Sequence, residues 1–206
     1  YRRDEIDTVG HLLYPDGINR GRGRLEKDAG QYDREEEVLF PSGCAAAYRK
    51  DLLDSIGGFD ESFFAYGDDT DLGLHARFAG ARCLLAPRAV VYHKYSGTAG
   101  AYSLFKAYQV ERNRIWILWK YFPLRWILLS PFYTGWRMAC HLAAGRHGVG
   151  ASGKALEKES LREVGRTVLR AYRDAWKRLP EVVGMRRAIW ARGKVTPPIF
   201  SGWLKR

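Results

Sequence analysis

The spacing of apolar and polar residues changes along the chain, and each spacing predicts a different element. Residues 1–36 are charged and rich in turn-forming residues, which predicts loops. Residues 38–40 are a short apolar run and predict a buried strand. Apolar residues then recur at helical spacing over residues 50–56, and the glycine pair that starts at Gly57 is typical of a helix end.

A second helix is predicted at a cluster of acidic residues. Apolar positions recur at helical spacing over residues 72–79, just after the carboxylates of Asp68, Asp69 and Asp71. We expect Asp68 or Asp69 to be the N-cap of this helix, with Asp71 in its first turn. By residue type alone, the cluster could be a helix cap, a metal site or a catalytic base.

Two strands are predicted after this helix, and helices after them. Residues 82–87 and 89–93 are apolar runs bounded by turn residues, and His93 ends the second run. Residues 153–192 have an apolar stripe at helical spacing, which predicts helices. Residues 194–206 contain two adjacent prolines and predict an irregular tail.

The segment 111–145 is apolar and aromatic, but basic residues and prolines interrupt it. It lacks a run of the roughly 18 apolar residues that a membrane-spanning helix needs. We therefore expect two amphipathic helices, divided at Pro123, that lie in a membrane interface. A buried helical hairpin is the alternative.

The net charge of +11 is unevenly distributed: residues 1–100 carry −4, residues 101–149 carry +6 and residues 150–206 carry +9. The basic part is expected to meet an anionic partner, either a membrane face or a nucleic acid. Three cysteines without a CxxC pair indicate a reducing compartment rather than a disulfide scaffold. No signal peptide is visible, and the chain begins within a pattern at Tyr1, so we expect an upstream part.

Several motifs follow one another in order between about Asp7 and Tyr121. They are the small-residue stretch in PSGCAAAYRK, the sequence GGFDE, the acidic cluster, His93, and RNR before an apolar helix. Together they resemble the C-terminal half of inverting family 2 glycosyltransferases, in particular the rhamnosyltransferase-like enzymes of bacterial cell-envelope polysaccharide synthesis. The resemblance implies an α/β fold, namely the C-terminal part of a GT-A (nucleotide-diphospho-sugar transferase) fold followed by amphipathic helices. The implied domains are the C-terminal half of the catalytic domain (1–100), aromatic and basic interfacial helices (101–149) and a basic helical tail (150–206).

The resemblance also implies roles for single residues. It places the catalytic base at Asp69, with Asp68 as the second catalytic carboxylate. Gly43 and Asp71 are expected to bind substrate, and His93 to bind a divalent metal ion, Mg²⁺ or Mn²⁺. The run from Asp69 to Asp71 also spells the metal-binding Asp-x-Asp of the family. Because the cluster follows GGFDESFFAYG and opens a helix, we interpret it as the base instead.

The expected function is transfer of a sugar, with inversion, from a nucleotide-sugar donor to a cell-envelope glycan or polyprenyl-linked acceptor, with rhamnosyl transfer as one form. The first half of the family's catalytic domain, which binds the donor, is not visible in this sequence. We expect a cytoplasmic enzyme that is peripheral at the inner face of the plasma membrane, binds an anionic membrane surface and does not bind nucleic acid. The alternative is a non-catalytic basic module that binds membrane or nucleic acid.

Overall fold

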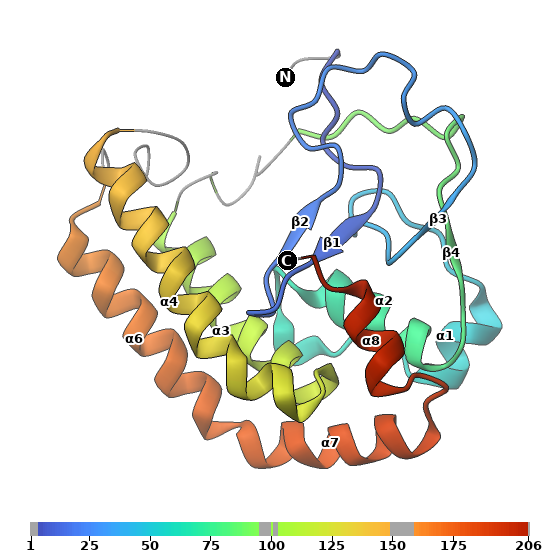
Figure 1. The fold of residues 1–206 in the computed structure, drawn as a ribbon. Coiled ribbons are helices and arrows are strands. Elements are labelled where there is room, and N and C mark those ends of the chain that lie inside the picture. The colour runs from blue at the N-terminus through green and yellow to red at the C-terminus, as the bar shows by residue number, and fades with distance from the viewer. Residues whose placement is uncertain (1–3, 95–99, 101–102, 149–158, 206) are drawn as a thin grey trace.

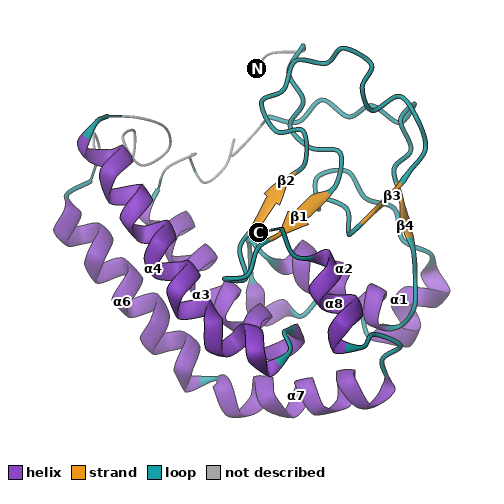
Figure 2. Cartoon of the chain, in the orientation of Figure 1, coloured by secondary structure: helices purple, strands orange, loops and turns teal. Residues whose placement is uncertain are grey.

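Short strands and loops form the first part of the chain, and long helices form the rest (Figures 1 and 2). The computed structural model describes residues 4–94, 100, 103–148 and 159–205. The strands are β1 (His11–Leu13), β2 (Asn19–Gly21), β3 (Glu37–Val38) and β4 (Cys83–Leu84). The helices are α1 (Lys50–Ile56), α2 (Asp68–Phe78), α3 (Leu104–Tyr121), α4 (Leu124–Arg146), α6 (Leu161–Lys177), α7 (Leu179–Arg192) and α8 (Pro197–Trp203), with a 3₁₀ turn at Glu61–Phe63.

The strands form two antiparallel pairs. β1 pairs with β2, with His11 opposite Gly21, and β3 pairs with β4, with Val38 opposite Cys83. Among the described residues, the parallel pairing is limited to a single bridge from Leu13 to Leu204, which ties the C-terminal end to β1. The described chain is thus a mixed helix and strand structure, which agrees with the predicted α/β class at that level.

Two sequence predictions are wrong: the strand at residues 89–93 and the irregular tail. Residues 89–93 form a loop rather than a strand, and His93 therefore does not end a strand. Val90, Val91 and Tyr92 are more than half exposed. An apolar run that has no partner strand is not stabilised as a β-strand. The predicted irregular tail contains α8, which begins at two prolines and places Phe200 in the core.

The core is centred on α3. Its buried side chains include Ile115, Trp116 and Tyr121, and the helix packs against α2, α6 and α7. Helix α3 ends at Tyr121, and Pro123 precedes α4, which confirms the predicted break at this proline. Many side chains of α3 are buried in the core, the packing that the helical-hairpin alternative expects, so the interfacial position stays a prediction.

Much of the positive charge in residues 101–149 is used inside the protein. Arg114 bonds to Glu111 at 2.7 Å, and Arg137 reaches Glu111 at 2.9 Å and Asp16 at 2.5 Å. Lys120 is buried against two aspartates, and Arg112 donates to backbone carbonyls of the 3₁₀ turn. These side chains are therefore not available to an external anion.

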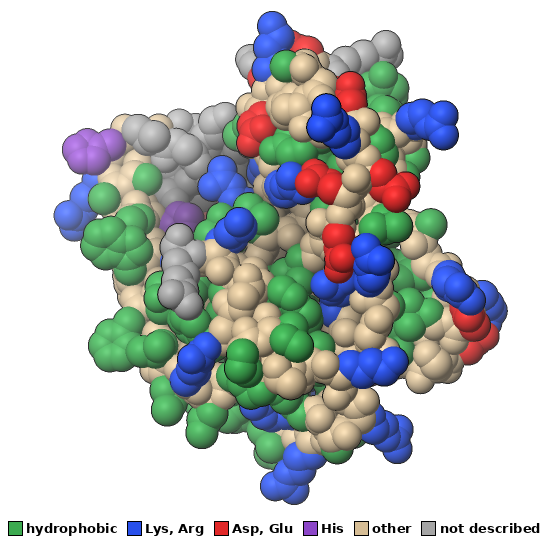
Figure 3. All heavy atoms as spheres, turned by 45° about the vertical axis from the view of Figure 1, so that its right-hand side comes forward, with side chains coloured by type: hydrophobic (Ala, Val, Ile, Leu, Met, Phe, Trp, Pro, Cys, Tyr) green, Lys and Arg blue, Asp and Glu red, His purple; other side chains and the backbone are tan. Residues whose placement is uncertain are grey.

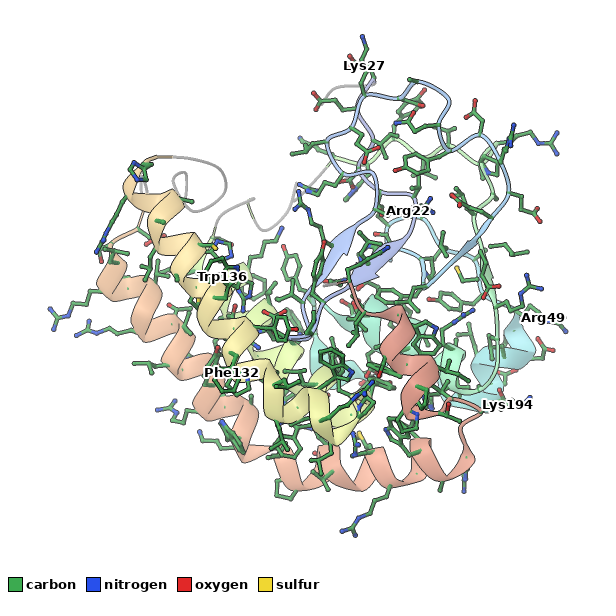
Figure 4. All side chains as sticks on the ribbon, viewed as in Figure 1. Arg22, Lys27, Arg49, Phe132, Trp136 and Lys194 are labelled. Atoms are coloured by element: carbon green, nitrogen blue, oxygen red, sulfur yellow. The ribbon has the colours of Figure 1, made fainter. Side chains whose placement is uncertain are left out.

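Helix α4 is different, because only Trp126, Ile127 and Ser130 of its side chains are buried. The exposed fractions of Leu124, Leu128, Phe132 and Trp136 are 62%, 66%, 75% and 73%. Figure 4 labels Phe132 and Trp136 on this helix. Within the described residues, no helix is long and apolar enough to cross a membrane.

Close packing between α2 and the residues after β3 gives a stability test. A Cβ added at Gly73 would overlap the buried side chain of Phe40, whereas one added at Gly165 in α6 would meet no atom within 4 Å. We expect Gly73→Ala to lower the free energy of unfolding by about 1–3 kcal/mol or more, because the core has no room for a methyl group. Gly165→Ala should raise it by up to about 1 kcal/mol through helix propensity. Urea unfolding of both variants measures the difference, and equal stabilities would contradict this packing.

Candidate functional site

The acidic cluster lies at the N-terminus of α2. Gly67 is the N-cap, and its φ of 91° is a conformation that glycine adopts easily. Gly67 lies against Ile117, so a side chain here would be crowded as well. Asp68, Asp69 and Asp71 all lie in the first turn, where free backbone N–H groups favour negative charge. The prediction of a helix start here is confirmed, but the prediction that Asp68 or Asp69 is the N-cap is wrong.

The carboxylate of Asp69 is held by three donors. The backbone N–H of Gly43 donates to Oδ2 at 3.1 Å, and the N–H and hydroxyl of Thr70 donate to Oδ1 at 2.7 and 3.3 Å. A Cβ at Gly43 would lie 3.3 Å from the Cβ of Asp69, so glycine permits this close approach. The bond between Gly43 and Asp69 is exposed, so the carboxylate is both oriented and accessible.

Asp68 lies beside Asp69 in a different environment. Burial raises the pKa of the Asp68 carboxyl, and the charge of Asp69 raises it further, while backbone N–H groups oppose the shift. Asp68 therefore accepts a proton more readily than an isolated aspartate does. Two adjacent carboxylates with different environments can divide the work of accepting and retaining a proton.

Asp71 points into the core. Its side chain is 3% exposed, and Lys120 Nζ lies 2.7 and 2.9 Å from its two oxygens. The Tyr121 hydroxyl lies 2.9 Å from the same carboxylate, and Asp60 of GGFDE reaches Lys120 at 3.1 Å. Burial raises the pKa of Asp71 against the opposing effect of Lys120. The substrate role of Asp71 stays a prediction without support here, because both oxygens already have partners inside the protein.

A strained loop leads into the cluster. Phe64 and Tyr66 have φ of 61° and 63°, a region that side chains other than glycine rarely adopt. The Asn113 amide donates to the carbonyls of Phe63, Ala65 and Tyr66 at 3.0, 2.9 and 2.7 Å. Asn113 is the middle residue of RNR, so this motif positions the loop before the acidic cluster. Sequence reasoning found the motif but not its role.

His11 is a further residue that sequence reasoning missed. The Asn19 amide lies 2.7 Å from His11 Nδ1 and also donates to the Thr70 hydroxyl at 2.7 Å, which links β1 and β2 to the start of α2. Burial lowers the pKa of His11, against the opposing charges of Asp69 and Asp7. A neutral imidazole is therefore favoured beside the candidate base. Because these contacts join distant segments, no spacing in the sequence signals them.

The predicted metal ligand His93 lies on a wide cleft. His93 Nδ1 is 2.7 Å from Asp7 Oδ2, and Cys44 lies beside them. The cleft has a volume of about 1680 Å³, and its lining includes Gly43, Cys44 and His93. His93 and Asp69 thus lie near the same loop, 41–45. His93 and Gly43 line the cleft, whereas Asp69, which accepts a hydrogen bond from Gly43, is not among the lining residues.

From Gly43 onward, the residues of this site lie in a segment that matches a known family. Residues 21–117 match the sequence model of the family described as Glycosyltransferase like family 2. This segment belongs to glycosyltransferase family 2. The family segment includes Gly43, the acidic cluster, His93 and RNR, and ends within α3.

Two relatives come from Mycobacterium tuberculosis, strains CDC 1551 / Oshkosh and ATCC 25618 / H37Rv. Each is an N-acetylglucosaminyl-diphospho-decaprenol L-rhamnosyltransferase and is 32% identical over 103 residues, covering 46% of this chain. The chain spans about a third of the length of these relatives, as the aligned region covers 33% of each. No solved structure gives a significant match.

Proposed function

We propose that this chain carries the catalytic base of an inverting glycosyl transfer from a nucleoside-diphosphate sugar. The observation behind the proposal is the accessible carboxylate of Asp69, held by Gly43 and Thr70 at a helix N-terminus within a family 2 segment. An acceptor hydroxyl needs to lose its proton as it attacks the anomeric carbon, and one positioned carboxylate suffices for this. The fold expectation carries over as a proposal: residues 1–100 are the C-terminal half of a GT-A catalytic domain.

The proposed chemistry follows from the site. The acceptor oxygen bonds to the anomeric carbon, the bond from that carbon to the diphosphate oxygen breaks, and Asp69 takes the hydroxyl proton. Asp68, whose pKa is raised by burial and by Asp69, stands beside the base and can share that proton. Gly43 and Thr70 keep the Asp69 oxygens in place during the transfer.

The family resemblance implies a divalent metal ion, and the residues present fit one. Asp7 offers an oxygen, His93 a ring nitrogen and Cys44 a sulfur, all within 4.8 Å of one another. A bound divalent cation would offset the negative charge of the leaving diphosphate. In the proposal His93 remains the metal ligand, as the resemblance implies.

The proposed acceptor is a polyprenyl-diphosphate-linked sugar, with rhamnosyl transfer as the favoured reaction, because the two relatives bear names of that kind. In the test, a panel of nucleotide-sugars is incubated with a polyprenyl-diphospho-N-acetylglucosamine acceptor and the natural polypeptide that carries these residues. We expect a glycosylated lipid whose new linkage has the anomeric configuration opposite to that of the donor, read by NMR. A product with retained configuration would contradict the proposed mechanism.

We further propose that α4 holds the protein peripherally on the inner face of the plasma membrane. Its exposed leucines, Phe132 and Trp136 form an apolar surface, and the helix contains no acidic residue. On the face shown in Figure 3, acidic side chains gather over the loop-rich half of the molecule, away from the long helices. Because most nearby basic groups are paired internally, we expect apolar contacts to contribute more than charge.

Vesicle flotation tests this placement. Phe132→Ser combined with Trp136→Ser should lower partitioning onto anionic vesicles by about tenfold or more, because each buried side chain contributes roughly 1.5–3 kcal/mol. Leu169→Ser is the control, since Leu169 is 70% exposed but lies on α6. High salt should remove only part of the binding. Unchanged partitioning of the double variant would argue against α4 as the contact surface.

A further inference from the structure

Three potential metal ligands from separate parts of the chain meet on the wall of the cleft. Asp7 precedes β1, Cys44 follows β3 and His93 follows β4. One carboxylate oxygen, the sulfur and one ring nitrogen all lie within 4.8 Å of one another. All three residues line the cleft of about 1680 Å³. The fold therefore gathers oxygen, sulfur and nitrogen donors at a place that a small ligand can reach.

Neighbouring groups orient these donors. Arg24 bonds to Asp7 Oδ1 at 2.7 Å, which leaves Oδ2 directed at His93 Nδ1, also at 2.7 Å. The Ser42 hydroxyl lies 3.3 Å from the sulfur of Cys44. Such outer contacts fix the direction of ligands in protein metal sites. A cation bound to both groups would replace the hydrogen bond between Asp7 and His93.

The types of donor select the class of metal. Mg²⁺ prefers oxygen ligands in octahedral geometry, and a thiolate is a poor ligand for it. A set of one thiolate, one imidazole and one carboxylate suits Zn²⁺, and three protein ligands leave a fourth position open. We propose that Asp7, Cys44 and His93, the three ligands that the described residues offer here, form a site for a zinc-class cation, with its open position facing the cleft.

This proposal changes the expectation of Mg²⁺ or Mn²⁺ for the same part of the molecule. The three ligands are proposed from their geometry alone. The open position could hold an oxygen of the donor's diphosphate, and that use rests on the proposed function. Cys44 directly follows Gly43, whose N–H holds Asp69. The cation site and the proposed base are thus connected by one short loop.

Cobalt spectroscopy tests the site without any sugar substrate. The full chain is stripped of metal with a chelator and titrated with Co²⁺, which reports thiolate ligation by a charge-transfer band and tetrahedral geometry by visible absorption. We expect both signals, with displacement by one equivalent of Zn²⁺ and no displacement by excess Mg²⁺. Absence of the charge-transfer band, or displacement by Mg²⁺, would overturn the proposal.

Matched variants separate the three ligands from other thiols. Cys44→Ser should abolish the charge-transfer band, whereas Cys83→Ser should keep it, because Cys83 lines the same cleft outside the cluster. Asp7→Asn and His93→Gln should each weaken Co²⁺ binding by about tenfold or more while the band remains. Circular dichroism checks that each variant is folded. A band that survives in Cys44→Ser would refute the site, and loss of sugar transfer alone would not bear on it.

Discussion

Asp69→Asn will lower glycosyl transfer by about 10²–10⁴-fold, the usual effect of removing a general base. Asparagine keeps the size of the side chain, and its oxygen can still accept the hydrogen bonds from the Thr70 N–H and hydroxyl, while its amide nitrogen cannot accept from the Gly43 N–H. It also loses the ability to take the acceptor proton. Turnover is measured in the natural polypeptide that carries these residues, with a nucleotide-sugar and a lipid-linked acceptor at saturation.

Donor binding and stability act as internal checks for this variant. We expect the affinity for the nucleotide-sugar and the melting temperature to change little, because Asp69 is partly exposed and has no ion-pair partner among the described residues. Asp54→Asn is the matched control, since Asp54 is an exposed aspartate in α1 that pairs only with Lys50 there. An Asp69→Asn enzyme that turns over as fast as the Asp54→Asn enzyme would remove Asp69 from the catalytic role.

Lys120→Met will have the largest effect on stability, with an expected loss of about 3–5 kcal/mol in the free energy of unfolding. Lys120 is buried between Asp71 and Asp60, at 2.7 and 3.1 Å. Methionine fills similar space but leaves the Asp71 carboxylate buried without a countercharge. Urea or thermal unfolding gives the value. Lys50→Met, which breaks an exposed pair on α1, should change stability little.

A rescue variant distinguishes the unpaired charge from a simple loss of packing. Lys120→Met combined with Asp71→Leu should recover much of the lost stability, because apolar replacement of both partners of a buried pair is often neutral. Tyr121 keeps one acceptor in that variant, the backbone carbonyl of Asp71 at 3.0 Å. If the double variant is as unstable as Lys120→Met alone, the ion pair is not the cause.

Most of the helices were predictable from the sequence because their signals are local, although α8 was not. Residues 50–56, the helix after the acidic cluster, and the break at Pro123 all follow from spacing within one or two turns. The strand at 89–93 was not predictable, because a strand depends on a distant partner that its own residues do not reveal. Aspartate is a preferred N-cap residue, which favours Asp68 or Asp69 as the cap of α2. The chain enters α2 with a positive φ instead, and Gly67 adopts it.

The candidate site was predictable only in part for the same reason. The acidic cluster and His93 were found by their order along the chain, which carries the family resemblance. The contact of Asp69 with Gly43 joins residues 26 positions apart. The contact of His11 with Asn19 joins two different strands. The composition of the chain gives no sign of either contact. The same holds for Lys120, which reads as surface charge in the sequence but is buried in the fold.

The three carbonyls gathered by Asn113 have a consequence for how enzyme kinetics should be read. The side-chain amide of Asn113 has no titratable proton, and the groups that it binds, at Phe63, Ala65 and Tyr66, are peptide carbonyls. The shape of the loop before the acidic cluster therefore does not depend on protonation or on ionic strength through this contact. A pH profile of turnover would then report the titration of groups around Asp69 rather than rearrangement of the loop that carries them.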